Sequence, residues 1–339
     1  MFERLGAQIP VVAAPMAGGP STPELVAAAA SVGGLGFLAG GYKSSDLLAA
    51  QIAAVRSSTG VFGVNLFAPA SLPVDRAAFE RYAAALAPVG ARFGVQLESA
   101  RVVEDSDSWE EKVDLLVAEP VPVVSFTFAV PPTSVIERFK RSGSVTAQTI
   151  TDVQEAKDAE AAGIDLLLIQ GFGAGGHSAI TRPGSLPADI PLTDLVARVK
   201  AASSLPVWAG GGIGSAEALS AVLGAGAEAG IVGSLLLRST ESGASHAYKS
   251  GLAAMAGTET VLTRAFSGRL ARGIRNAFID QFDAQAPSGY PAVHHLTSPL
   301  RRAAAEAGDW NYINLWAGGS YEAASDEPVG DIMRRLVET

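Results

Sequence analysis

The chain has 339 residues, of which 48% are hydrophobic and 17% are charged, so it can bury a large core. Its 34 acidic and 25 basic side chains give a net charge of −9, and no run of Lys or Arg offsets it. We therefore expect neither nucleic acid nor an anionic membrane surface as a partner. The absence of cysteine excludes disulfides, thiolate metal sites and cysteine nucleophiles.

The two most apolar segments do not have the pattern of a targeting signal or a membrane anchor. Pro10 and Pro15 interrupt the first apolar run, and no basic leader precedes it, so we expect no signal peptide. Glycines and Glu228 break the longest apolar stretch, residues 219–237, which therefore lacks the roughly 20 apolar residues that cross a bilayer. We expect a cytoplasmic protein.

Eight short runs that are apolar nearly throughout predict β-strands. Such runs are typical of parallel strands that are covered on both faces, whereas half-exposed strands alternate apolar and polar residues. In chain order they are residues 11–14, 35–39, 62–66, 123–126, 145–148, 166–170, 207–209 and 230–232.

Alanine-rich stretches with helical periodicity separate these runs. Several begin after a capping residue, such as Thr22 before Pro23, or Thr151 with Gln154 three residues further on. Eight strands with helices between them predict an α/β fold, the closed TIM (β/α)₈ barrel. The predicted helices are residues 23–31, 45–57, 74–87, 108–118, 133–141, 152–162, 192–203 and 215–224.

The alternation of strands and helices stops after residue 237. We predict a barrel over residues 1–238, a smaller and mainly helical inserted domain over 239–310 that covers the substrate, and a C-terminal segment over 311–339 that returns to the barrel. The inserted part holds four arginines. We interpret Arg264, Arg269 and Arg272 as a solvated helix face paired with acids, and Arg275, followed by Asn276, as a candidate for binding an anion.

Ligands of such barrels bind where the strands end, so the residues just after each strand are the candidate site. Glycines dominate after the last two strands, in Gly210–Gly211–Gly212 and Gly233–Ser234. A single glycine pair is explained by a tight turn of the backbone, with no role in binding. Two neighbouring turns of this kind favour a phosphate site, because glycine lets backbone N–H groups approach the anion.

Polar side chains also lie at these strand ends. Asn65 and Gln170 are amides that either bond to the backbone or match the donors and acceptors of a flat heterocycle. His177 ends a glycine-rich loop after the sixth strand, where catalysis or substrate contact is favoured over a structural role. His294 and His295 have no acidic or thiol neighbours in the sequence and predict no metal site, and His246 is interpreted as a surface residue.

The same residues resemble the nitronate monooxygenase family, formerly called 2-nitropropane dioxygenases. The resemblance covers nearly the whole chain, and its motifs are residues 14–19, 33–36, 63–65, 170–177, 209–213, 266–273 and 315–318. It implies an FMN barrel in which His177 faces an alkyl nitronate, such as propionate 3-nitronate, or a nitroalkane, which O₂ oxidises to a carbonyl compound and nitrite. It also implies flavin contacts for Met16, Asn65, Gln170, Gly175, Gly212, Gly233 and Ser234, and we add their strand-end neighbours Pro15, Ala17, Gln148, Gly176 and Gly211.

Three positions depart from the family pattern. Phe172–Gly173 stand where a Glu usually precedes the Ala-Gly-Gly-His motif, Ile231 replaces a Gln, and Gly319–Ser320 replace Gln-Gly. Three alternatives therefore stay open: an FMN enoyl reductase or NAD(P)H:quinone reductase of the same fold, a flavin-binding protein without turnover, and a barrel that binds a phosphate without flavin. The oligomeric state stays open as well.

Overall fold

The computed structural model describes residues 1–70, 72–182 and 184–338, and its centre is a closed barrel of parallel strands. The strands follow chain order round the barrel, and Val11↔Gly230 pairing between the first and last of them closes it. The prediction of a TIM barrel is confirmed. The barrel strands are β1 (Val11–Ala13), β2 (Leu35–Ala39), β3 (Phe62–Phe67), β4 (Val123–Thr127), β5 (Val145–Ile150), β6 (Leu166–Gln170), β8 (Val207–Gly210) and β9 (Ala229–Val232).

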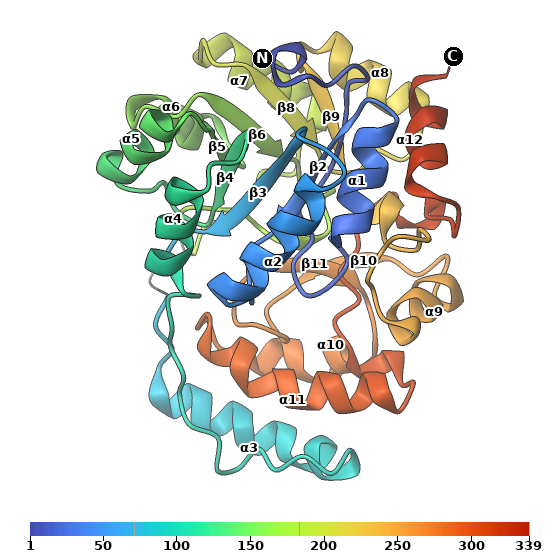
Figure 1. The fold of residues 1–339 in the computed structure, drawn as a ribbon. Helices are drawn as coiled ribbons and strands as arrows, with labels where there is room; N and C mark the ends of the chain where they lie inside the picture. The colour runs from blue at the N-terminus through green and yellow to red at the C-terminus, as the bar shows by residue number, and fades with distance from the viewer. Residues whose placement is uncertain (71, 183, 339) are drawn as a thin grey trace.

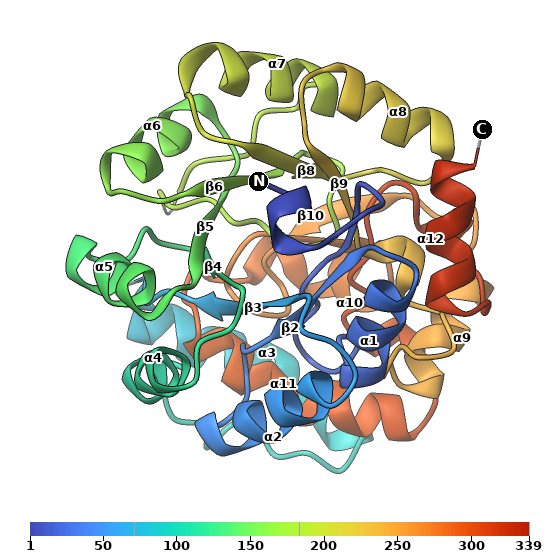
Figure 2. The ribbon, with the colours of Figure 1, turned by 45° about the horizontal axis from the view of Figure 1, so that its top comes forward.

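A ring of helices surrounds these strands, as Figure 2 shows. The C-terminal helix α12 (Val329–Val337) completes the ring by packing between α1 and α8. The other helices of the ring are α1 (Pro23–Ser31), α2 (Ser45–Arg56), α4 (Trp109–Ala118), α5 (Thr133–Ser142), α6 (Val153–Ala161), α7 (Leu192–Ala202) and α8 (Ala216–Gly224).

Capping side chains set the starts of four of these helices, α1, α2, α6 and α8. Thr22 accepts a hydrogen bond from Leu25 N at the start of α1, as the sequence predicts. The predicted cap of α6 is wrong by one residue, because Asp152 caps this helix. Thr151 instead donates its hydroxyl proton to the buried carboxylate of Glu155.

The barrel interior is solid below its mouth. Phe2 lies edge-on to Trp208 at a centroid distance of 5.2 Å, and both belong to an apolar cluster that fills the lower half of the barrel. A larger cluster packs the outer faces of the strands against the helices. Because apolar side chains fill the lower half, a ligand has room only at the C-terminal ends of the strands.

A second layer covers that mouth, and Figure 1 shows it below the barrel. It has its own apolar core, which joins α3 (Arg76–Arg92), α9 (His246–Ala254), α10 (Ala277–Phe282) and α11 (Ala292–Glu306). The segment expected to be mainly helical also contributes β10 (Thr260–Thr263) and β11 (Ala271–Ile274), which form a sheet with β7 (Gly176–His177). The predicted domain boundaries remain a prediction. The predicted first domain includes α3, whose buried side chains belong to the second core.

Short 3₁₀ helices link these elements, at Glu3–Leu5, Ser234–Leu236, Asp283–Gln285, Trp310–Tyr312 and Tyr321–Ala323. Among the residues that the structure describes, no helix is both long enough and apolar enough to cross a membrane.

Candidate active site

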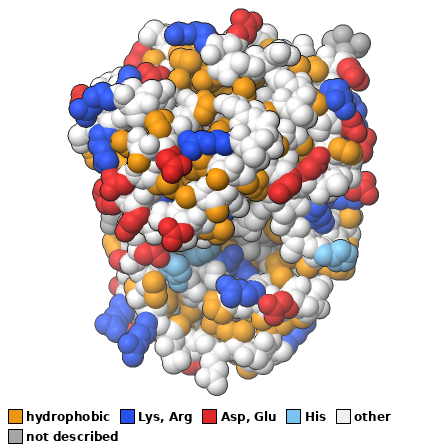
Figure 3. Space-filling view, in the orientation of Figure 1, with side chains coloured by type: hydrophobic (Ala, Val, Ile, Leu, Met, Phe, Trp, Pro, Cys, Tyr) orange, Lys and Arg blue, Asp and Glu red, His pale blue; other side chains and the backbone are white. Residues whose placement is uncertain are grey.

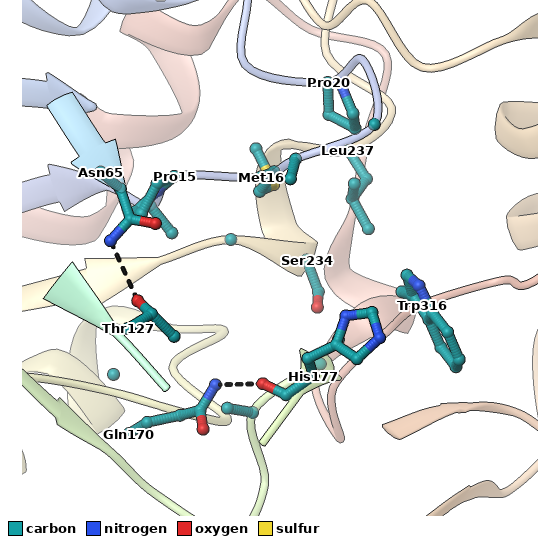
Figure 4. Close-up of a pocket in the computed structure, with 18 of the residues that line it drawn as sticks. Pro15, Met16, Pro20, Asn65, Thr127, Gln170, His177, Ser234, Leu237 and Trp316 are labelled. Atoms are coloured by element: carbon teal, nitrogen blue, oxygen red, sulfur yellow. Dashed lines mark hydrogen bonds between the residues drawn. The ribbon is translucent and has the colours of Figure 1, made fainter. Parts of the chain in front are cut away.

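A cavity of about 440 Å³ lies between the barrel mouth and the second layer. Figure 3 shows the surface hollowed between these two layers, and Figure 4 shows side chains from both layers facing the cavity. Its volume is within the usual range for a site that takes a cofactor or drug-sized ligand. Nearly all of the predicted site residues line it: Pro15, Met16, Ala17, Asn65, Gln170, Gly175, Gly176, His177, Gly211, Gly212, Gly233 and Ser234.

Gln148 is the exception among the predicted site residues. Successive side chains of a strand point to opposite faces, and in β5 Ala147 packs in the barrel interior while Thr149 lines the cavity. Gln148 therefore points away from the cavity, is fully buried, and donates its amide to Thr149 O at 3.1 Å. The apolar run located the strand in the sequence but did not show which of its residues face inward.

The glycine turns after β8 and β9 form one end of the cavity. Gly211 and Gly212 have φ values of +127° and +87°, which residues other than glycine rarely adopt. A Cβ on Gly212 would meet no atom within 4 Å, so this turn is open to the cavity. The α8 helix begins four residues later behind the cap of Ser215, and its N-terminus adds a positive dipole end. The arrangement suits an anion such as a phosphate.

The two amides predicted for the site are held by different partners. Asn65 donates to Ser125 Oγ at 2.9 Å and to Thr127 Oγ1 at 3.0 Å, and its carbonyl oxygen accepts no hydrogen bond from the described residues. Gln170 donates to His177 O at 2.9 Å and accepts from Ala179 N at 2.7 Å. Asn65 thus presents a free acceptor at the cavity wall, while Gln170 ties the histidine loop to the barrel.

The C-terminal segment closes the cavity beside the glycine turns. Gly319 N donates to Gly173 O at 3.0 Å, and Gly318 N donates to Ser234 Oγ at 2.8 Å. The backbones approach so closely that a Cβ on Gly175 would lie 2.5 Å from Gly318 N. This contact explains why the histidine loop requires a glycine at residue 175.

His177 is fixed by both layers. It forms β7 with Gly176, and it pairs with Ala271 of β11, so the second layer and the barrel together set its position. Its ring Nε2 lies 2.8 Å from Ser267 Oγ. Three aromatic rings surround the imidazole at centroid distances of 5.4 to 6.0 Å: Trp316, Tyr290 and Phe128.

The imidazole of His177 is neutral in this environment. Burial lowers its pKa most, and the charges of Arg269 and Arg301 lower it further, to about 3. Ser267 Oγ lies within hydrogen-bond distance of both His177 Nε2, at 2.8 Å, and Arg269 O, at 3.1 Å. The serine hydroxyl therefore links the imidazole to the backbone of the second layer.

Two of the arginines correct the interpretation of the inserted segment. Arg269 is 5% exposed and Arg272 is 7% exposed, so neither belongs to a solvated helix face. Arg269 donates to Ser178 O and Ile180 O, with its guanidinium 3.9 Å above the ring of Phe128.

Arg275, the predicted anion ligand, is instead half-exposed and paired with Glu259 and Asp280. The difference arises because Arg269 and Arg272 belong to a turn and a strand covered by the barrel loops.

Sequence reasoning missed several cavity residues that come from outside the barrel motifs. Tyr42 stacks on His294 at 4.2 Å, and both line the cavity together with Arg301. Tyr42 and Phe128 also have positive φ values of 64° and 84°, which are uncommon for bulky residues and concentrate at functional sites. No sequence motif signals His294 or Arg301, because α11 brings them to the cavity from the second layer.

The fold and the site define a (β/α)₈ barrel with a cavity at its C-terminal mouth, one end of which suits an anion. The family model described as nitronate monooxygenase matches residues 3–339, and the chain belongs to this family. The predicted resemblance and the predicted enzyme class, an oxidoreductase, are both confirmed.

Several proteins are similar to this chain over almost its full length. A probable nitronate monooxygenase of Staphylococcus aureus (strain JH9) is 34% identical, over 99% of this chain and 96% of the relative. The structure of a nitroalkane oxidase from Streptomyces ansochromogenes is 42% identical with a TM-score of 0.93, over 99% of this chain and 96% of that one. FabK from Thermotoga maritima is 25% identical with a TM-score of 0.76, over 99% and 93% of the two chains.

The three departures from the family pattern all lie at the cavity. Gly173, Ile231 and Ser320 line it. At the position of the missing Glu, the guanidinium of Arg272 lies 4.5 Å above the ring of Phe172 and donates to Phe172 O at 3.0 Å. A cation–π contact therefore holds Arg272 against the glycine loop in this chain.

Proposed function

We propose that the protein binds FMN at the barrel mouth and oxidises nitronates with O₂ to a carbonyl compound and nitrite. The observation that carries the proposal is the charge of the cavity. Among the described residues that line it there is no Asp, Glu or Lys, and Arg301 is the one charged side chain, although the chain has a net charge of −9. Such a cavity favours anionic ligands, and both a flavin phosphate and a nitronate are anions.

The residues present fit FMN. The turns at Gly211–Gly212 and Gly233–Ser234 would hold the phosphate, because they are open to the cavity and lie near the N-terminus of α8. Met16 and the free carbonyl oxygen of Asn65 would contact the ring system, which has donors that an amide oxygen accepts. Bound FMN would supply the electron transfer between substrate and O₂.

The neutral state of His177 favours a preformed nitronate over a neutral nitroalkane. A general base works best when its pKa is near the working pH, and a pKa of about 3 makes this imidazole a weak base. A nitronate has already lost the α-proton and needs no base. His177 would then orient the substrate within the aromatic wall formed by Phe128 and Trp316.

The test is nitrite release by the FMN-loaded protein in air, with a primary alkyl nitronate and the parent nitroalkane as paired substrates. We expect nitronate turnover to exceed nitroalkane turnover by about 100-fold or more, since the weak base gives little proton abstraction. Turnover of the nitronate should have no pH limb between pH 5 and pH 8, because His177, with a pKa of about 3, stays neutral throughout. A limb near pH 6.5, or equal turnover of both substrates, would contradict the assigned role of His177.

Two control experiments separate the alternative functions. Rapid anaerobic bleaching of the flavin by NADH or NADPH would favour a reductase of the FabK kind. A yellow protein that releases no nitrite from any nitronate would favour flavin binding without turnover. His177→Ala tests the substrate contact, and we expect it to lower kcat/KM for the nitronate by about 100-fold while leaving the visible spectrum of the flavin in place.

A further inference from the structure

Tyr42 carries a hydroxyl group that the proposed reaction leaves unassigned. It follows the Gly40–Gly41 turn after β2 and lines the cavity at the barrel mouth. The hydroxyl of Tyr290 donates to the hydroxyl of Tyr42 at 3.0 Å. Two hydroxyls carry two protons, and this contact uses one of them. The other proton has no acceptor among the residues that the structure describes.

The unused proton belongs to Tyr42. Tyr290 donates its own proton, so the O–H of Tyr42 is the donor that lacks an acceptor within the described chain. Burial raises the pKa of Tyr42 to about 12, so the phenol keeps its proton at neutral pH and remains a donor. A desolvated donor without an acceptor costs about 1–3 kcal/mol. An oxygen atom of a ligand in the cavity would remove this cost.

Contacts on several sides fix the position of Tyr42. Its ring stacks on His294 at a centroid distance of 4.2 Å and an interplanar angle of 2°, and the ring of Phe67 lies edge-on to it at 5.5 Å. Its backbone N–H donates to Asp107 Oδ1 at 2.9 Å, and Asp107 in turn pairs with the buried Lys112 at 2.8 Å. A donor that is already fixed loses little conformational freedom when a ligand binds.

The backbone on both sides of this contact is strained. Tyr42, Asp107 and Ser108 have φ values of 64°, 55° and 52°. They are three of the four residues other than glycine with a positive φ in the described part of the chain. Such conformations cost of order 1–3 kcal/mol each and concentrate at functional sites. Their presence at one contact favours a binding role for Tyr42 over a purely structural one.

Tyr290 connects Tyr42 to His177. The ring of Tyr290 lies 5.7 Å from the imidazole of His177 by centroid distance, while its hydroxyl contacts Tyr42. Tyr42 and His177 therefore flank the same ring, and both line the cavity. A small group with two oxygen atoms can contact both side chains at once.

We propose that the hydroxyl of Tyr42 donates a hydrogen bond to an oxygen of the nitronate group, and that Tyr42 binds the substrate together with His177. This inference rests on the proposed function. The negative charge of a nitronate lies largely on its two oxygens, which are therefore strong acceptors. Oxidation withdraws this charge, so the hydrogen bond is strongest before the reaction. Tyr42 thus contributes to binding of the anion and not to its oxidation.

The experiment uses Tyr42→Phe, which removes the hydroxyl and keeps the ring that stacks on His294. The first measurement is the infrared N–O stretching band of nitroethane bound to the FMN-loaded protein under anaerobic conditions, isolated by nitrogen-isotope labelling. The second is the kinetics of nitrite release from ethyl nitronate in air. The matched control is Tyr312→Phe, because Tyr312 belongs to the core of the second layer and is not among the described residues that line the cavity.

A hydrogen bond to a nitro oxygen weakens the N–O bond, so we expect the band of bound nitroethane at a higher wavenumber in Tyr42→Phe than in the wild type. The KM for ethyl nitronate should rise about 10- to 100-fold, the range for losing a hydrogen bond to a charged group. The kcat should not fall, because the lost hydrogen bond does not become stronger during the reaction. Tyr312→Phe should leave the band in place and the KM within about twofold of the wild type.

An unchanged band or an unchanged KM in Tyr42→Phe would overturn the proposal. Weaker FMN binding in this variant with an unchanged band would assign the hydroxyl to the flavin, and would overturn it as well. The proposed function is tested separately by nitrite release from the wild type. A wild type that releases no nitrite but whose nitroethane band depends on Tyr42 would refute the function and keep the hydrogen bond.

Discussion

Replacing Gly175 by alanine should separate the histidine loop from the C-terminal segment. The added Cβ would lie 2.5 Å from Gly318 N, 2.6 Å from Ala317 C and 2.8 Å from Ala317 Cα. All three are backbone atoms, so no side-chain rotation can relieve the contact. The two segments must move apart, and the hydrogen bonds of Gly318 to Ser234 and of Gly319 to Gly173 lie directly in their path.

The cost follows from these contacts. Losing two hydrogen bonds costs about 2 kcal/mol in total, and overpacking of a close contact costs about 1–3 kcal/mol. We therefore expect Gly175→Ala to destabilise the closed site by about 3–5 kcal/mol. If the closed site is the form that binds FMN, even the lower value weakens FMN binding by about 160-fold.

The measurement is FMN affinity by fluorescence quenching, together with the melting temperature of the protein with and without FMN. Gly319→Ala is the matched control, because a Cβ there meets no atom within 4 Å and its φ lies outside the left-handed region. We expect the control to change stability by less than about 0.5 kcal/mol. If Gly175→Ala binds FMN as tightly as Gly319→Ala does, the close approach of the two backbones is not required for the site.

Three further variants test the structure around the site. Glu155 is fully buried and accepts four hydrogen bonds from two threonines. Glu155→Gln should therefore lower the free energy of unfolding, measured in urea, by about 2–5 kcal/mol. The control Asp158→Asn, on the exposed face of the same helix, should lower it by less than about 0.5 kcal/mol. Folding lowers the pKa of His177 from 6.5 to about 3 and that of His294 from 6.5 to about 2. As the pH falls below 6.5, these histidines therefore become protonated in the unfolded chain but not in the folded one, and the free energy of unfolding decreases. The slope should reach about 1.4 kcal/mol per pH unit for each histidine, and a His294→Asn variant that keeps the full slope would refute this assignment. Ser320 lines the cavity with a hydroxyl that has no partner among the described residues, so Ser320→Ala should weaken FMN binding about threefold to tenfold in the same titration, and unchanged affinity would show that the hydroxyl does not reach the phosphate.

Local sequence patterns predicted the barrel and one side of the site. Strand β2 is apolar throughout, and β6 is apolar up to the Gln at its end, because helices cover them outside and side chains fill them inside. Their runs therefore stand out without any knowledge of the fold. The glycine turns follow β8 and β9, and His177 ends the loop that follows β6. Their place at the mouth is therefore a consequence of parallel strand direction.

Tertiary structure decided what the sequence pattern could not, namely which residues face the cavity and what covers it. Gln148 and Thr149 are neighbours, yet strand alternation turns only Thr149 to the cavity. Arg301 carries no motif, and it becomes a site residue only because α11 packs across the barrel mouth. The periodicity of a segment shows which of its side chains share one face of a helix or strand. Which other segment packs against that face is decided by contacts between parts of the chain that are more than a hundred residues apart.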